Sequence, residues 1–171
     1  MYQPKLRIAG INPESIVDGP GIRWTVFTQG CPHECPGCHN PGTWSMSGGR
    51  EVSVQELLTS IRNNPLLDGI TLSGGEPLVQ AEACLNLCLE VKQMGLSVWL
   101  YTGYTFEWIM SDGSEAQRML IAQADVLVDG RFILEERSLE LLFRGSKNQR
   151  LIDIPKTMSD GTIVLWVPPL W

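Results

Sequence analysis

The sequence is poor in basic residues and in long apolar runs. Its 13 Lys and Arg are outnumbered by 19 Asp and Glu, which gives a formal charge of −6, and the basic residues form no run. Such a chain lacks the electrostatic footprint of a nucleic-acid-binding protein and the basic face of a membrane-surface binder. No stretch approaches the ~20 apolar residues of a membrane span, and no apolar signal core follows the first residues. We therefore expect a cytoplasmic protein that binds neither nucleic acid nor membranes.

Cysteine and histidine are also scarce, but most of them lie in one place. The chain has five cysteines and two histidines in 171 residues. An odd cysteine count far below that of a disulfide scaffold points, in a reducing compartment, to metal ligands or catalysis. Three of the cysteines and both histidines fall between residues 31 and 39.

Length and patterning predict a single α/β domain over residues 1–171. The chain is too short for a complete eight-unit β/α barrel, which needs about 250 residues. Strand signals at 22–28, 69–73, 97–101 and 125–129 alternate with helix signals, among them capping boxes at 53–56 and 114–117 and a helix over 79–94. This alternation predicts about four parallel βα units, a partial (half) β/α barrel. Segments 151–154 and 162–166 flank an Asp-Gly pair, which predicts a C-terminal β-hairpin at one edge.

The region that we call the cysteine loop, residues 30–50, carries the strongest chemical signal. Cys31, Cys35 and Cys38 have the spacing Cys-x3-Cys-x2-Cys directly after a predicted strand. Thiolates favour iron–sulfur clusters, zinc or copper(I). Three of them cannot saturate a four-iron cluster, so one iron would accept a non-protein ligand. A structural zinc site, with His33 or His39 as the fourth ligand, is the alternative, although neither histidine has the separated spacing of usual zinc sites.

A second motif, Ser-Gly-Gly-Glu-Pro at residues 73–77, follows the predicted strand 69–73. Glycines at the end of a strand adopt conformations denied to other residues and let a ligand approach the main chain. In parallel sheets the ligand crevice lies outside these strand ends. Taken alone the motif is a turn, but after the cysteine loop it favours a binding site.

Together these motifs resemble the radical S-adenosylmethionine (SAM) superfamily and, more narrowly, the glycyl-radical-enzyme activases. The resemblance covers most of the chain, in residues 18–23, 29–41 with Thr43 and Trp44, 73–78, 99–104, 125–130 and 143–150. The last two segments are similar to those of activases that act on anaerobic ribonucleoside-triphosphate reductase. The resemblance implies that Cys31, Cys35 and Cys38 hold a 4Fe–4S cluster, whose fourth iron is chelated by the amino and carboxylate groups of SAM.

The resemblance also implies which residues contact SAM. Backbone carbonyls of Gly74, Gly75 and Glu76 would receive the SAM amino group. Gly37 and His39, on either side of the third cysteine, would contact SAM largely through the main chain.

Three residues near the ends of later strands complete the implied site. Thr102 and Asp129 match positions that touch the methionine or ribose portion of SAM, and the cation of Arg131 would pair with the SAM carboxylate. One departure is Gly37, since many superfamily members have an aromatic residue there that packs on the adenine. Tyr104 or Phe27 would have to replace it.

By the same resemblance, the reaction is reductive cleavage of SAM to methionine and a 5′-deoxyadenosyl radical. This radical takes a hydrogen atom from a glycine of the anaerobic ribonucleoside-triphosphate reductase, and a low-potential donor such as a flavodoxin or ferredoxin supplies the electron. The cofactor carries the chemistry, so no side chain is assigned as catalytic. Two alternatives stay open: an activase of another glycyl-radical enzyme, of the pyruvate formate-lyase type, and a non-catalytic zinc or iron–sulfur module.

Other chemically suggestive residues have simpler explanations. Cys84 and Cys88 lie on the apolar stripe of the predicted helix 79–94, where buried cysteine behaves as a small hydrophobic residue. Arg144 and Arg150 are equally consistent with contacts to SAM or the reductase and with surface salt bridges.

Overall fold

Four parallel strands form the middle of the sheet, as the alternation of strand and helix signals predicts. The computed structural model describes residues 2–170. Its parallel strands are β2 (Arg23–Thr28), β4 (Gly69–Gly74), β5 (Ser97–Tyr101) and β6 (Val126–Asp129), which pair in this order. Their carboxyl ends therefore lie at one edge of the sheet.

Three antiparallel strands extend this core into a mixed sheet of seven. The long strand β1 (Lys5–Ser15) pairs with β2 and with β3 (Arg50–Ser53), and β7 (Arg150–Asp153) pairs with β6. The order is β3-β1-β2-β4-β5-β6-β7. Neither β1 nor β3 was predicted from the sequence. The α/β class and the parallel strands are confirmed, whereas the half β/α barrel is not.

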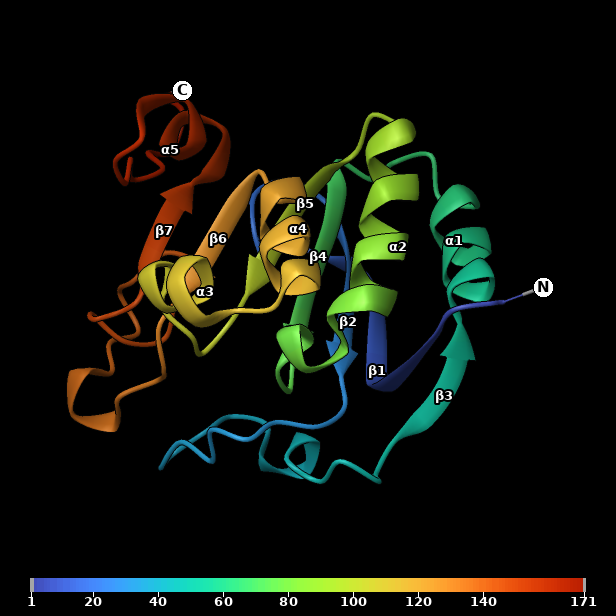
Figure 1. Cartoon of the computed structure of the whole chain (residues 1–171), viewed down its shortest axis with the longest axis horizontal. Coiled ribbons are helices and arrows are strands. Elements are labelled where there is room, and N and C mark those ends of the chain that lie inside the picture. Colours follow the sequence, from blue (N-terminus) through green and yellow to red (C-terminus); the bar gives the residue numbers. More distant parts are fainter. Residues whose placement is uncertain (1, 171) are drawn as a thin grey trace.

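Helices cover one face of the sheet (Figure 1). They are α1 (Val54–Arg62), α2 (Ala81–Gln93), α3 (Phe106–Asp112), α4 (Glu115–Gln123) and α5 (Ile154–Asp160), with single 3₁₀ turns η1 (Pro41–Thr43), η2 (Pro77–Gln80) and η3 (Leu134–Glu136). Both predicted capping boxes are present, at the starts of α1 and α4. Among the described residues, no helix combines the length and apolar character needed to cross a membrane.

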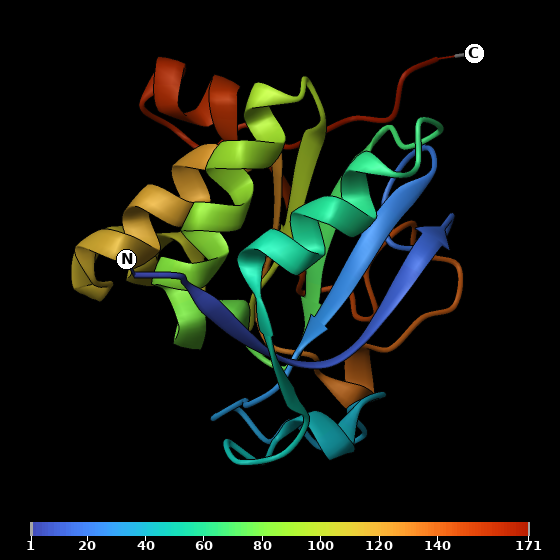
Figure 2. The ribbon, with the colours of Figure 1, turned by 90° about the vertical axis from the view of Figure 1, so that its right-hand side faces the viewer.

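Side chains of the strands alternate between the two faces, which separates two apolar clusters. Val98 and Leu100 of β5 join the main core under the helices, whereas Trp99 and Tyr101 pack on the opposite face with Phe143. Figure 2 shows α2 and α4 on one side of the sheet and the coil of residues 131–149 on the other. This coil follows β6, so it lies next to the carboxyl ends of the parallel strands.

The predicted C-terminal hairpin is correct in its pairing but wrong in its turn: residues 151–153 and 164–166 are antiparallel, with hydrogen bonds from the Asp153 N–H to the Val164 carbonyl and from the Trp166 N–H to the Leu151 carbonyl. Residues 154–160 form α5, so Asp160 and Gly161 end a helix instead of making a two-residue turn. Asp153 caps the start of α5, a proline occupies its first turn, and Gly161 has the left-handed φ of 75° that commonly ends a helix. The segment after α5 returns alongside β7 through one isolated bridge, while β7 pairs with β6.

Candidate functional site

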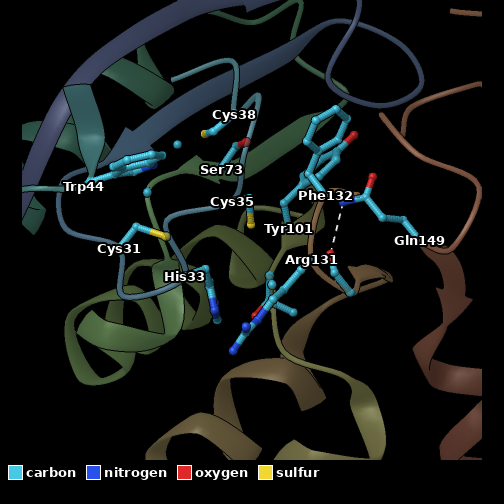
Figure 3. A pocket seen from close by; sticks show the side chains of 15 residues that line it. Cys31, His33, Cys35, Cys38, Trp44, Ser73, Tyr101, Arg131, Phe132 and Gln149 are labelled. Carbon is cyan, nitrogen blue, oxygen red and sulfur yellow. Dashed lines mark hydrogen bonds between the residues drawn. The ribbon is translucent and has the colours of Figure 1, made fainter. Parts of the chain in front are cut away.

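A cavity at the carboxyl ends of the parallel strands brings most of the predicted site residues together (Figure 3). Its volume is about 160 Å³, and its walls come from the cysteine loop and from the segments at the ends of β4, β5 and β6. The lining residues include Cys31, His33, Cys35, Cys38, Trp44, Ser73, Gly74, Gly75, Thr102, Gly103, Gly130, Arg131 and Phe132. This is the position where open α/β sheets bind ligands.

All three cysteines of the loop are free, half-buried thiols on this cavity. The loop turns sharply between them, because Glu34 and Gly37 both have left-handed backbones, with φ of 48° and 75°. Burial raises the pKa of the Cys31 and Cys35 thiols above the ordinary value of 9.0. Thiols must lose their protons when they bind metal, so loading the site would release protons.

Glu76 lies just beyond β4 and is fully buried behind the cavity. Its carboxyl oxygens accept hydrogen bonds from the Leu78 N–H (3.0 Å), the Thr102 hydroxyl (2.9 Å) and the Gly103 N–H (2.8 Å). The Nε2 atom of His33 is 2.7 Å from the same carboxyl group. Glu76 therefore joins the ends of β4 and β5 to the cysteine loop, and its side chain is already saturated by the protein.

The two glycines before Glu76 allow the end of β4 to pack closely against the start of the cysteine loop. A Cβ atom on Gly74 would come within 2.5 Å of the Phe27 Cα, and one on Gly75 within 2.5 Å of the Gly30 carbonyl oxygen. Two backbone hydrogen bonds fix this contact. The Gly75 N–H donates to the Thr28 carbonyl and the Glu76 N–H to the Gly30 carbonyl, both at 2.8 Å. Close backbone packing thus requires the glycines, while their other side lines the cavity.

The histidines are not arranged as zinc ligands. His33 is directed to Glu76, and His39 is exposed with its ring 5.5 Å from that of Phe132. Within residues 2–170, no three His, Cys, Asp or Glu side chains are grouped closely enough to hold one metal ion. Thiolates that bind separate irons of a cluster need no common ion. The arrangement is therefore compatible with a cluster whose irons are bound by separate thiolates.

A second, larger cavity of about 710 Å³ adjoins the first and shares Gly103, Gly130 and Arg131 with it. One wall is aromatic, since Tyr104 stacks on Trp108 with ring centroids 4.3 Å apart. Tyr104 also meets the His33 ring edge-on at 4.6 Å. Of the two aromatic residues proposed to replace the missing one at Gly37, Tyr104 lines this cavity, whereas Phe27 lines neither.

Asp129 lies in the second cavity, but its carboxylate is held by the protein. Its Oδ2 accepts the Phe106 N–H at 2.8 Å and pairs with Arg150 at 2.5 Å, and its Oδ1 accepts the Arg150 Nε–H at 3.0 Å. Arg150 also pairs with Glu107 at 2.7 Å. These bonds give Asp129 and Arg150 a structural role at the start of α3. A contact between Asp129 and SAM stays a prediction.

The remaining predicted residues fall into two groups. Arg131 is exposed, lines both cavities and forms no ion pair in the described part of the chain, so its cation is available to an anion. Gly37 and His39 lie outside the set of lining residues, and Gly37 packs under Leu134. Arg144 donates to the Gln149 carbonyl and braces the 144–149 turn.

The cysteines of α2 have no access to the site. Cys84 and Cys88 are fully buried in the main core, and burial raises the pKa of Cys88 to about 12. This agrees with the prediction that they are core residues.

Several lining residues at or just after the ends of strands were not predicted from the sequence. Phe132 and Gln149 come from the coil beyond β6, and Tyr101 from the last position of β5. The signal available for Phe132 was its place three residues after a predicted strand, beside Arg131. Nothing in the sequence indicates that Gln149 returns to this edge.

One buried polar group on the cavity lacks a partner. The indole N–H of Trp44 is buried without a hydrogen bond within the described residues. Such groups are rare in native proteins and cost about 1–3 kcal/mol. Three soft sulfur donors and a free N–H around one cavity fit an iron–sulfur group, which Cys31, Cys35 and Cys38 would hold.

Comparisons with known proteins agree with this chemistry. Residues 17–152 match the family model described as a 4Fe-4S single cluster domain. The chain is 38% identical over 145 residues to the anaerobic ribonucleoside-triphosphate reductase-activating protein of Vibrio cholerae, covering 80% of this chain and 91% of that protein. The protein of that name from Enterobacteria phage T4 is 37% identical over 149 residues, which cover 82% and 90% of the two chains.

A pyruvate formate-lyase-activating enzyme is also similar. The enzyme of Clostridium pasteurianum is 43% identical over 106 residues, which cover 58% of this chain but only 44% of that enzyme.

Proposed function

Because this chain belongs to the family of anaerobic ribonucleoside-triphosphate reductase-activating proteins, we propose that it generates the glycyl radical on such a reductase. The chain is a radical SAM enzyme of the glycyl-radical-activating type. The observation that carries the specific proposal is the convergence of three free thiols and the end of β4 on one cavity.

Cys31, Cys35 and Cys38 would hold a 4Fe–4S cluster, with SAM as the ligand of the remaining iron. When bound and reduced by an external donor, the cluster would pass one electron to SAM, and this chemistry would supply methionine and the 5′-deoxyadenosyl radical that takes a hydrogen atom from a glycine of the reductase. The protein's own task is to fix the thiols and the strand ends around the cavity. Glu76 does this by tying the cysteine loop to β4 and β5.

We propose that SAM is bound mainly by main-chain groups. Carbonyls of Gly74, Gly75 and Glu76 would receive its amino group, because the Glu76 side chain has no free oxygen. Main-chain atoms of Gly37, Cys38 and His39 would contact it from the cysteine loop.

Side chains would complete this site on two sides. The free cation of Arg131 would pair with the SAM carboxylate. The Tyr104 ring is the better placed of the two candidates for the adenine, since it borders the larger cavity. The Thr102 hydroxyl donates to Glu76, and the Asp129 carboxylate pairs with Arg150. Thr102 and Asp129 would therefore contribute to SAM binding through the neighbouring groups that they hold.

The reductase is favoured over pyruvate formate-lyase as the protein substrate by chain coverage. The alignment spans 91% of the Vibrio cholerae reductase activator but 44% of the Clostridium pasteurianum enzyme. We also propose that residues 1–171 form one domain, whose parallel strands act as an open part-barrel that admits a loop of the reductase. A flavodoxin, ferredoxin or similar donor would supply the electron.

The test is anaerobic mixing of the iron-loaded protein with SAM, a low-potential reductant and an anaerobic ribonucleotide reductase. We expect 5′-deoxyadenosine by chromatography and a glycyl radical by electron paramagnetic resonance. Pyruvate formate-lyase in place of the reductase should give no radical. Absence of 5′-deoxyadenosine from protein that carries four irons would contradict the proposal.

Matched cysteine variants make the test specific. Cys38→Ala should lose iron, sulfide and all product, because it removes one of three ligands. Cys88→Ala, which removes a thiol from the core, should keep iron content and product.

A further inference from the structure

Trp44 is the feature that the proposed function leaves unexplained. In the described residues, two buried side-chain polar atoms have no hydrogen-bond partner, the Trp44 Nε1 and the Thr25 Oγ1. Trp44 is the tryptophan that lines the cavity of the three cysteines. Because buried donors in native proteins almost always have an acceptor, this N–H calls for one that belongs to the site.

The main chain at Trp44 is held in place by backbone hydrogen bonds on both sides of the loop. The backbone N–H of Cys31 donates to the Trp44 carbonyl at 3.1 Å, and the backbone N–H of Trp44 donates to the Pro41 carbonyl at 3.2 Å. Next to it, the Gly30 N–H donates to the Thr43 carbonyl at 2.7 Å. The backbone of Trp44 is therefore fixed beside the first cysteine, which places its side chain on the cavity of the three thiols.

The ring extends into the space between Cys31 and Cys38 (Figure 3). Cys31, Cys35 and Cys38 line the same cavity as the Trp44 ring, together with Ser73, and thiolate or sulfide sulfur accepts hydrogen bonds from N–H donors. Hydrogen bonds to the sulfurs of an iron–sulfur group are one of the factors that set its reduction potential. They stabilise the more negative, reduced form and so raise the potential.

We propose that the Trp44 indole N–H donates a hydrogen bond to a sulfur of the iron–sulfur group held by Cys31, Cys35 and Cys38, and thereby raises its reduction potential. This rests on the proposed function, since it requires that the three thiolates hold such a group. Trp44 is then a positioning and tuning residue, and it takes no part in binding the metal.

The test compares the full-length protein with Trp44→Phe and with Trp166→Phe as the matched control. Both variants lose one indole N–H, but Trp166 packs against Trp99 and lies outside the cysteine cavity. Iron and sulfide are measured first, and the midpoint potential is then determined without SAM by redox titration. We expect equal loading of all three, a lower potential in Trp44→Phe, and no shift in Trp166→Phe.

The outcomes distinguish failure of the proposed function from failure of the proposed role of Trp44. Wild-type protein that assembles no iron–sulfur group contradicts the proposed function. Equal loading with equal potentials overturns the role of Trp44, as does a difference that arises only when SAM is added, because SAM would then be the acceptor.

A second measurement covers the case in which Trp44→Phe does not fold or load. Wild-type protein with ¹⁵N-labelled indole is reduced and studied by pulsed electron paramagnetic resonance. A ¹⁵N coupling to the reduced group supports the hydrogen bond, since Trp44 is the tryptophan on the cavity. Its absence overturns the proposal.

Discussion

A buried ionisable side chain lies at each end of β4, Arg23 at the amino end and Glu76 at the carboxyl end. The two side chains have different hydrogen-bond partners and connect different parts of the molecule. At the amino end, Arg23 is 1% exposed and forms no ion pair with a carboxylate of residues 2–170. It donates instead to neutral oxygens of Thr71 (2.8 Å), Ser97 (2.9 Å) and Ile70 (2.6 Å). At the carboxyl end, Glu76 is 0% exposed, accepts from Leu78, Thr102 and Gly103, and is hydrogen-bonded to His33, so it contacts three separate segments.

The difference follows from what each side chain connects. Arg23 ties together the starts of β2, β4 and β5, at the edge of the sheet opposite the cysteine loop, and burial lowers its pKa to about 10. Glu76 ties the ends of β4 and β5 to a loop that carries metal-ligating thiols. Loss of Arg23 should therefore change stability alone, whereas loss of Glu76 should change stability and the site together.

Replacement of Glu76 should have the largest effect. Glu76→Ala leaves buried N–H and hydroxyl donors without an acceptor, which should lower the free energy of unfolding by about 3–5 kcal/mol and reduce iron loading. Urea unfolding and iron analysis measure the two effects. Glu76→Gln keeps one oxygen and should cost less, about 1–3 kcal/mol. Full iron loading in a destabilised Glu76→Ala protein would contradict the claim that Glu76 supports the site as well as the fold.

Replacement of Arg23 should come next. Arg23→Met keeps the length and apolar stem of the side chain but removes the donors to the starts of β4 and β5, at a cost of about 2 kcal/mol. Iron content and the reduction potential should stay at wild-type values after allowance for the folded fraction. A changed potential would show that the two ends of β4 are coupled.

His33 tests the link between Glu76 and the cysteine loop alone. His33→Ala removes one partner of the carboxyl group and should cost about 1.5 kcal/mol, because three other donors remain. Amide hydrogen exchange should quicken in residues 30–50 and stay unchanged around Arg23. His33→Gln, which can still donate, should restore part of the protection.

The Glu107–Arg150 pair should have the smallest effect, about 0.5 kcal/mol, because Glu107 is exposed. A hydrogen bond from Arg150 lowers the pKa of Glu107 below its ordinary 4.5. A carboxyl group whose pKa is lowered in the folded protein stabilises the fold fully at pH values above its ordinary pKa. This stabilisation is lost as the pH falls through the lowered pKa of the folded protein. The stability difference between wild type and Glu107→Gln should thus be constant near neutral pH and vanish in acid. A difference that persists in acid would indicate a packing role.

Local signals predicted much of the fold. Capping boxes, apolar stripes and β-branched runs specified α1, α2, α4 and the four parallel strands, since each depends on neighbours in sequence. Strand β1 was missed because its pairing with β2 and β3 is a long-range contact. The Asp160–Gly161 pair was read as a hairpin turn, yet the same residues serve equally well to end a helix, and Asp153 decided the outcome by capping α5.

The sequence by itself determined the kind of chemistry, because the spacing of Cys31, Cys35 and Cys38 limits which metal group three thiols can hold. It also determined which strand end would carry the site, through Gly74 and Gly75. Only the tertiary structure decided how these parts are fixed. The bonds of Glu76 to His33 and Thr102, and the burial of the Trp44 indole, join residues separated by tens of positions in the chain, and pattern within a segment carries no information about such contacts.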